Sequence, residues 1–325
     1  MTPLEEQQHK QHRFRIALSF ALVYVFWGST YLAMRVAVAT VPPYAVGSTR
    51  YLISGLLMLL WCALTGRNVR VNRRDLVRLL AIGVLLLSIA NVGVLWAERY
   101  VTSGLAALIV AIVPIWVVVL ETWVFRVGKM PVRGLLGLAL GIGGMVVLLW
   151  PKITAGTHLG RLELFGAAIL IFASLSWALG SILSHRWTLS VDVFTSAAWQ
   201  MLLAGLINTM VAALTGQFSR AVWRAPARWA IAYLVLSGSL IGYTAYIWLL
   251  EHVPPPKVAT YAYVNPVVAV FLGWLLLHES VDIFTLIGTV VIIGSVALVN
   301  TAKLKGRIAE SVPTEIADVP ASVGD

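Results

Sequence analysis

Two charged residues of the 325-residue chain lie in or beside apolar stretches, where a charge is costly. Arg50 is the seventh residue of the run that begins at Tyr44, and Glu98 ends the next long run in the segment LWAERY. A charge within a bilayer usually faces the interior of a helix bundle and has a partner there. We therefore expect Arg50 and Glu98 to pair and to act in gating or proton coupling. The alternatives are that Arg50 extends to the interface and that Arg99 neutralises Glu98.

Aromatic and amide side chains occur in the same kind of stretch. Trp27 and Trp177 have matching central positions in the two halves of the chain, too deep for an interfacial belt. Aromatic rings with a few hydrogen-bonding groups suit a cavity for amphipathic or aromatic solutes. The residues predicted to line such a cavity are Trp27, Asn91, Trp177, Tyr243, Tyr246, Tyr263 and Asn265. The alternatives are core packing for the tryptophans, a membrane-interface belt for the tyrosines, and helix-to-helix hydrogen bonding for Asn91.

Two prolines stand inside apolar runs. Pro114 occurs in ALIVAIVPIWVVVL and Pro266 in TYAYVNPVVAVFL. Proline lacks a backbone donor and clashes with the preceding turn, so each position is a predicted hinge in a broken helix. Because Tyr261, Tyr263 and Asn265 precede Pro266, solute recognition is expected mainly in the second half.

Searches for enzyme and metal signatures give a negative result over the whole sequence. There is no HExxH, GxSxG or DDxxD-like motif, and no GxxxxGK[ST] phosphate-binding loop. His and Cys residues do not occur at metal-binding spacing, and Cys62 is the one cysteine. The sequence therefore predicts no enzyme, no cofactor, no metal and no direct use of ATP.

Composition determines the class of protein. The chain is 59% hydrophobic and 12% charged, whereas soluble domains have about 25% charged residues. Its apolar residues form runs of about 20 residues, the length that crosses a bilayer as a helix. We count ten such runs, at about 15–38, 43–65, 76–97, 101–125, 131–150, 163–184, 192–215, 226–250, 257–277 and 282–300. The prediction is an all-α polytopic membrane protein with ten transmembrane helices in a lipid bilayer.

The net charge of +10 could suggest a nucleic-acid partner, but its distribution indicates a membrane topology instead. With a cytoplasmic N-terminus, 16 of the 24 Lys and Arg residues fall in inside segments and six in outside loops. This bias predicts that both termini are cytoplasmic and that nucleic acid is not a partner. It is clear in the first half and weak in the second, where Arg220, Arg224 and Arg228 are on the outside.

An internal repeat organises the ten runs. An offset of 150 places Gly55 over Gly205 and Arg50 over Gln200, and the two prolines need 152. The predicted repeats are 15–150 and 163–302, flanked by a polar cytoplasmic tail at 1–14 and a disordered one at 303–325. Five helices per repeat is an odd number, so the second copy must be inverted in the membrane, as in many secondary transporters.

Several segments, in order, resemble the drug/metabolite transporter superfamily, and within it the EamA-domain exporters with two EamA repeats. They are FWGSTYLAMRVAV (26–38), the Arg50-Tyr51 pair, SGLAALIVAIVP (103–114), SWALGSI (176–182) and TYAYVNPVVAVFLGWLLLHE (260–279). The resemblance implies an inverted repeat of ten helices in a bacterial inner membrane. It also implies export of amino acids, other metabolites or drugs without ATP, often coupled to protons. In that fold the fifth and tenth helices lie outside the pathway.

The resulting hypothesis is a secondary transporter that exports a small metabolite or drug by alternating access, with proton coupling as a further expectation. The alternative is a flippase-like transporter of a lipid-linked headgroup. The sequence leaves open the substrate, the direction of transport, the resting conformation and the oligomeric state, a homodimer included.

Overall fold

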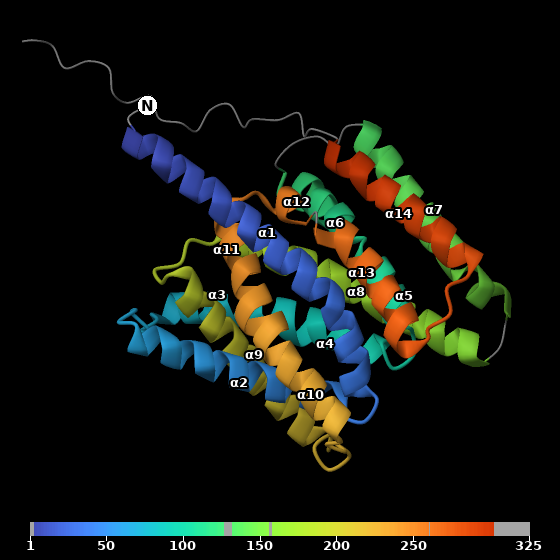
Figure 1. Ribbon diagram of the computed structural model, residues 1–325, viewed down its shortest axis with the longest axis horizontal. Coiled ribbons are helices and arrows are strands. Elements are labelled where there is room, and N and C mark those ends of the chain that lie inside the picture. The colour runs from blue at the N-terminus through green and yellow to red at the C-terminus, as the bar shows by residue number, and fades with distance from the viewer. Residues whose placement is uncertain (1–2, 127–131, 156–157, 260, 302–325) are drawn as a thin grey trace, which may run out of the picture.

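The computed structural model describes residues 3–126, 132–155, 158–259 and 261–301, and every regular element in this part is helical (Figure 1). The first half contains α1 (Pro3–Val38), α2 (Pro43–Leu64), α3 (Arg73–Gly83), η1 (Val84–Asn91), α4 (Val92–Ala97), α5 (Ser103–Val110), α6 (Val113–Val119), η2 (Leu120–Val124) and α7 (Val132–Ala155). The second contains α8 (His158–Arg186), α9 (Val193–Leu214), α10 (Ala225–Tyr233), η3 (Leu234–Tyr243), α11 (Thr244–His252), α12 (Pro255–Val258), α13 (Tyr261–Leu277) and α14 (Ile283–Thr301). The all-α class is thus confirmed for these residues.

Seven helical stretches of the described residues are long and apolar enough to cross a membrane. They are Lys10–Val38, Pro43–Leu64, Arg73–Ala97, Ser103–Val124, Gly160–Arg186, Val193–Leu214 and Ala225–His252. Three shorter apolar helices are Val132–Gly144, Val264–Leu277 and Ile283–Ser295. These ten stretches occur in the order of the ten apolar runs in the sequence.

The third and eighth of these stretches each contain a π-helical segment. η1 begins at Val84 and η3 at Leu234, 150 residues later, and each continues into an α-helix, α4 or α11. A π-helix has one more residue per hydrogen-bonded turn than an α-helix, and such turns are frequent at functional sites. The sequence analysis did not predict these segments.

Helices α2 and α9 pack against each other through two glycines. A Cβ on Gly55 would lie 2.6 Å from the backbone nitrogen of Leu202, and a Cβ on Gly205 would lie 2.7 Å from that of Leu52. Both pairs are related by the 150-residue offset, so the contact is reciprocal. Glycine is required here because the two backbones approach too closely for any side chain.

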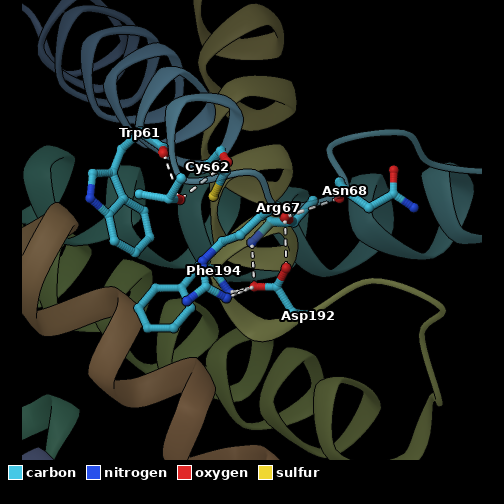
Figure 2. A network of polar contacts seen from close by, with 8 residues as sticks. Trp61, Cys62, Arg67, Asn68, Asp192 and Phe194 are labelled. Carbon is cyan, nitrogen blue, oxygen red and sulfur yellow. Dashed lines mark hydrogen bonds and ion pairs between the residues drawn. The ribbon is translucent and has the colours of Figure 1, made fainter.

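The ends of α2 and α9 are also connected. Figure 2 shows Arg67, three residues after α2, reaching Asp192 beside the rings of Trp61 and Phe194. The ion pair measures 3.2 Å, and the Asp192 carboxylate also accepts the backbone N–H of Phe194 at 2.9 Å, which caps α9. The pair is about one-third exposed, so it contributes less than about 1 kcal/mol. The main effect of the ion pair is to orient Asp192, which positions the first turn of α9.

A corresponding contact occurs at the opposite ends of these helices. Gln217 lies three residues after α9 and 150 residues after Arg67, and its side-chain oxygen accepts the backbone N–H of Tyr44 at 3.0 Å. The backbone N–H of Val222 donates to the carbonyl of Thr40 at 3.0 Å. Arg67 and Gln217, each three residues after its helix, therefore both reach the start of the other helix.

Helices α7 and α14 lie side by side at one edge of the molecule (Figure 1). A Cβ on Gly141 would lie 3.0 Å from the Ser295 hydroxyl, and one on Gly144 would lie 2.9 Å from Val291. The glycines of the fifth apolar run thus serve close helix contact, as expected from their spacing.

The two prolines differ in their helical context. Pro114 lies at the start of α6, directly after an interruption at Ala111 and Ile112 that separates α5 from α6. Pro266 lies inside α13, and the interruption in that half comes earlier, between the end of α12 at Val258 and the start of α13 at Tyr261. The expectation of a helix broken at each proline is therefore corrected for Pro266. Pro266 cannot donate a backbone hydrogen bond inside α13, yet this helix continues through it from its start at Tyr261, five residues earlier.

The predicted tails fall partly outside the described residues. α1 begins at Pro3, so most of the segment 1–14 continues the first helix, and His12 packs against Trp248 at a ring-centroid distance of 6.2 Å. Residues 303–325, the second predicted tail, lie outside the described residues.

Candidate functional site

A small cavity lies among the helices of both halves. Its described lining comes from α1, α2, η1, α4, α5, α8, η3 and α13, and not from α7 or α14. The residues are Trp27, Thr30, Tyr31, Met34, Arg50, Tyr51, Leu87, Ala90, Asn91, Val94, Val110, Ala173, Ser174, Trp177, Gly238, Tyr243, Tyr261 and Asn265. The space is about 50 Å³, enough for a few waters but far below the ~300 Å³ of small ligand pockets. A larger solute therefore requires the lining to move.

Four aromatic rings form one wall of this site and its support. The ring centroids of Trp27 and Trp177 are 5.3 Å apart with an edge-on geometry, and Tyr261 lies 5.2 Å from Trp27. Tyr246 lies behind them, 4.8 Å from Trp27 and 5.3 Å from Trp177. Such aromatic pairs stabilise the packing beyond area burial by about 0.5–1.5 kcal/mol each. The two tryptophans thus form a direct contact between the repeats.

Hydrogen bonds hold these rings in place. The Trp27 indole donates to the carbonyl of Gly238 at 3.1 Å, and a Cβ on Gly242 would overlap the Trp27 ring. The Trp177 indole donates to the Tyr246 hydroxyl at 2.9 Å. Close approach of Trp27 to η3 is therefore possible because position 242 is glycine.

Tyr246→Phe should lower the stability of the purified protein by about 1–2 kcal/mol. The Tyr246 hydroxyl bonds both the Trp177 indole and the Ser181 hydroxyl, at 2.9 and 2.6 Å, so its removal takes one hydrogen-bond partner from each of these buried groups. Chemical unfolding in detergent provides the measurement. Tyr100→Phe is the matched control, since Tyr100 is half-buried beside Phe165. Equal stability of the two variants would contradict the role given to Tyr246.

Arg50 projects into the cavity from α2 and is 3% exposed. Its Nε donates to the Ser239 hydroxyl at 2.8 Å and its Nη1 to the Asn91 side-chain oxygen at 3.1 Å. Its guanidinium also lies over the Tyr51 ring, 4.9 Å from the centroid. The expected pairing with Glu98 is thus corrected, because Arg50 bonds neutral groups on η1 and η3 instead.

Comparison with known proteins identifies the architecture that holds this cavity. Residues 15–150 and 164–301 each match the EamA-like transporter family. The chain belongs to the EamA-like transporter family. The family match therefore assigns the two sides of the cavity to the two EamA segments, with Trp27, Arg50 and Asn91 from the first and Trp177 and Asn265 from the second.

Individual relatives agree with the family match. The chain is 35% identical over 287 residues to the uncharacterized inner membrane transporter YedA of Escherichia coli K12, covering 87% of this chain and 90% of YedA. It is 23% identical over 279 residues to the uncharacterized transporter YoaV of Bacillus subtilis 168, covering 86% and 94%. A solved crystal structure superposes with a TM-score of 0.65 at 17% identity, covering 89% of this chain and 98% of that one. The last likeness concerns the fold alone.

Glu98 of this EamA-like transporter lies beyond the cavity, at the end of α4, and is fully buried. Neither carboxylate oxygen has a hydrogen-bond partner among the described residues, while Arg35 donates to the backbone carbonyl of Glu98. Burial raises the pKa of the Glu98 carboxyl well above its usual range; the charge of Arg35 opposes this effect and that of Glu279 adds to it. Glu98 is therefore a buried acid that keeps its proton to a higher pH than an exposed glutamate does.

A second hollow lies close to Glu98, and we call it the vestibule. It measures about 680 Å³, and its charged lining residues are Arg35, Arg99, Arg224 and Glu279. Glu279 also accepts from the backbone N–H and the hydroxyl of Ser103, at 3.0 and 2.9 Å, which caps α5. Glu98 interacts electrostatically with Arg35 and Glu279 of the vestibule and with Tyr31 of the cavity lining. Glu98 thus interacts with residues that line both the vestibule and the cavity.

Most of the predicted cavity residues meet in one place. Trp27, Asn91, Trp177, Tyr243 and Asn265 line the cavity. Tyr246 does not appear in the lining and instead supports Trp177. The side chain of Tyr263 lies outside the described residues.

Sequence reasoning missed other lining residues, among them Thr30, Tyr31 and Tyr51, and it named Tyr261 only as a neighbour of Pro266. The signal for Tyr31 and Tyr261 was available, because they lie four residues from Trp27 and Asn265 and so share a helical face with them. Tyr51 had no such signal, since its contact with the cavity depends on how α2 is rotated.

Proposed function

We propose that this chain is a secondary transporter that exports small metabolites, such as amino acids, or drugs across the bacterial inner membrane by alternating access. The observation that carries the proposal is the central cavity, which both EamA segments line with aromatic rings, a buried arginine and two amides. Substrate sites of secondary transporters lie at such repeat interfaces. The inner-membrane location is supported by the name of YedA and by the apolar helices.

We further propose ten membrane spans in two inverted repeats, 15–150 and 163–302, with both termini in the cytoplasm. The seven long and three shorter apolar helices support the number of spans. The reciprocal contacts of Gly55 with Leu202 and of Gly205 with Leu52 support a pseudo-twofold relation, because the 150-residue offset converts one contact into the other. The excess of Lys and Arg in the first-half inside segments supports the orientation.

In this proposal the site residues divide by role. Solute binds in the cavity at Trp27, Asn91, Trp177, Tyr243 and Asn265. Tyr246 and Tyr263 contribute to the same site, since Tyr246 shares a helical stretch with Tyr243 and Tyr263 shares α13 with Asn265. Arg50 takes part in closing the pathway, and Glu98 couples opening to proton exchange. The segments around Pro114 and Pro266 act as hinges, supported by the helix interruptions that precede both prolines. The small volume of the cavity supports a cycle in which these helices move.

The test is a thermal-shift screen of the purified full-length protein against amino acids and cationic drugs, followed by flux of each hit in proteoliposomes. We expect a stabilising hit to be transported, with saturation and with counterflow against preloaded unlabelled solute. Protein-free liposomes and the Trp27→Ala variant serve as controls, since Trp27 joins both repeats at the cavity. Chemical conversion of a hit without a second compartment, or stimulation of lipid scrambling instead of solute flux, would contradict the proposal.

A further inference from the structure

We propose that the transported solute carries a single carboxylate, and that the guanidinium of Arg50 binds it in the cavity. This inference rests on the transporter function proposed above and names the chemical class of its substrate. It begins with the surroundings of Arg50. The side chain is buried, and its two hydrogen-bond acceptors, Ser239 and Asn91, are both neutral.

A buried charge is normally compensated by a partner of opposite charge. Arg50 donates to Ser239 and Asn91, and within the described residues no carboxylate forms a hydrogen bond or ion pair with it. Among the described residues that line the cavity, Arg50 is also the sole charged one. The cavity therefore presents one uncompensated positive charge, and a monovalent anion would complete it.

The remaining donors of Arg50 are suited to a carboxylate. A guanidinium has five N–H groups in a planar fork, and the bonds to Ser239 and Asn91 use two of them. The free N–H groups can bind both oxygens of a carboxylate in parallel. A phosphate carries about −1.5 to −2 charges at pH 7, more than one arginine neutralises. A cationic head group that lacks a carboxylate would be repelled.

The rest of the lining indicates the body of the solute. Trp27, Trp177 and Tyr261 offer apolar faces, so the carboxylate should be attached to an apolar or aromatic body. The Tyr51 hydroxyl and the Asn265 side-chain oxygen are buried without hydrogen-bond partners among the described residues. Both can receive polar hydrogens from a solute, such as those of an ammonium group.

The vestibule gives an independent indication. Three of its four charged lining residues are the arginines Arg35, Arg99 and Arg224, and a basic hollow of this kind concentrates anions. Arg224 was among the arginines that the positive-inside rule left unexplained. An anionic solute that passes through the vestibule explains why these arginines are there.

The repeat supplies the variant for the test. Gln200 is the equivalent of Arg50, and its side-chain oxygen accepts the Tyr243 hydroxyl while its amide donates to Ser196 at 3.0 Å. Glutamine is thus already accommodated at this depth of the equivalent helix. Arg50→Gln removes the charge with a side chain that can keep hydrogen bonds, and Arg50→Lys keeps the charge without the fork. Arg228→Gln, at an exposed position, is the matched control.

The experiment measures binding by equilibrium dialysis to purified full-length protein, with probes that share one aromatic body. The probes are 3-phenylpropionate, phenylalanine, phenylalaninamide and phenyl phosphate. We expect the two carboxylates to bind at least tenfold more tightly than the amide or the phosphate. Arg50→Gln should weaken carboxylate binding by about 10–100-fold, with a smaller loss in Arg50→Lys and none in Arg228→Gln.

Several results would overturn the proposal: binding of the amide or phosphate as tightly as the carboxylates, no binding of either carboxylate, or unchanged affinity in Arg50→Gln. If Arg50→Gln does not fold, the order of probe affinities for the wild-type protein and for the Arg50→Lys variant still tests the carboxylate site. Flux in proteoliposomes separates this inference from the transporter function. Transport of phenylalaninamide but of neither carboxylate would retain the transporter and remove the carboxylate site.

Discussion

Gly55→Leu and Gly205→Leu should each prevent the chain from accumulating as a folded protein. In each case the new side chain would start 2.6–2.7 Å from a backbone nitrogen of the opposite helix, which cannot move aside as a flexible side chain can. Even alanine at either position should lower the stability by about 1–3 kcal/mol, because α2 and α9 must separate to admit one methyl group. The leucine variants add three more heavy atoms and should exceed that range.

The measurement is the yield of monodisperse protein in mild detergent by fluorescence-detected size exclusion, followed by chemical unfolding of whatever folds. Gly143→Leu and Gly294→Leu are matched controls. They are a pair with an offset of 151, and a Cβ at either would meet nothing within 4 Å. We expect wild-type yields from both controls. Similar yields from all four leucine variants would show that the α2–α9 contact is looser than the structure has it.

The comparison of Gly55 with Gly205 also tests the repeat. If α2 and α9 are related by a pseudo-twofold axis, the two alanine variants should be destabilised to a similar extent. Their effects should not add in the double variant, because one separation of the helices relieves both contacts. Full additivity would contradict a single shared interface.

The correspondence of these glycines could be predicted from the sequence because the two halves align at a nearly constant offset. Gly55 and Gly205 follow from a simple offset, and the tendency of small residues to mark close helix contacts follows from packing. The apolar helices were readable because bilayer thickness sets their length. Neither argument specifies which residues of two different helices meet, so the reciprocal contact with Leu202 and Leu52 required the structure.

The partner of Arg50 could not be predicted for a related reason. Sequence reasoning paired it with Glu98, the nearest plausible partner at the outer end of the third apolar run, since buried charges need compensation. The structure places Ser239 and Asn91 there, and both lie in π-helical segments, η3 and η1. A π-helical turn depends on packing rather than on a local sequence signal. An argument from α-helical periodicity therefore cannot predict which way the side chains after such a turn point. The aromatic residues were found because Trp27 and Trp177 occupy equivalent places.

Glu98→Gln should remove the dependence of transport on a pH gradient, which is the second large effect we expect. Glu98 is fully buried, its carboxylate has no hydrogen-bond partner among the described residues, and its pKa is raised by burial. The charged and titratable groups around it are Arg35 and Tyr31 on α1 and Glu279 after α13. An acid of this kind can carry a proton at pH values where an exposed glutamate has lost it.

The same shift predicts how stability changes with pH. Above about pH 4.3, the usual pKa of glutamate, the unfolded chain releases the Glu98 proton while the folded protein keeps it. Unfolding therefore becomes easier as pH rises, with a slope of at most about 1.4 kcal/mol per pH unit. The slope ends where the pH reaches the raised pKa of the folded state. In Glu98→Gln this contribution is absent, so the variant should be the more stable protein at neutral pH.

Flux and stability must be measured on the same variants to separate coupling from folding. In proteoliposomes, wild-type uptake should respond to an imposed pH gradient, whereas Glu98→Gln should show exchange of labelled for unlabelled solute but no response to the gradient. Glu251→Gln, which removes an exposed carboxylate in the last turn of α11, should behave as the wild type. A gradient response retained in Glu98→Gln would assign the proton to another group. Because neutral glutamine mimics protonated glutamate in shape, retained exchange would place the proton, rather than the side chain itself, in control of opening between the cavity and the vestibule.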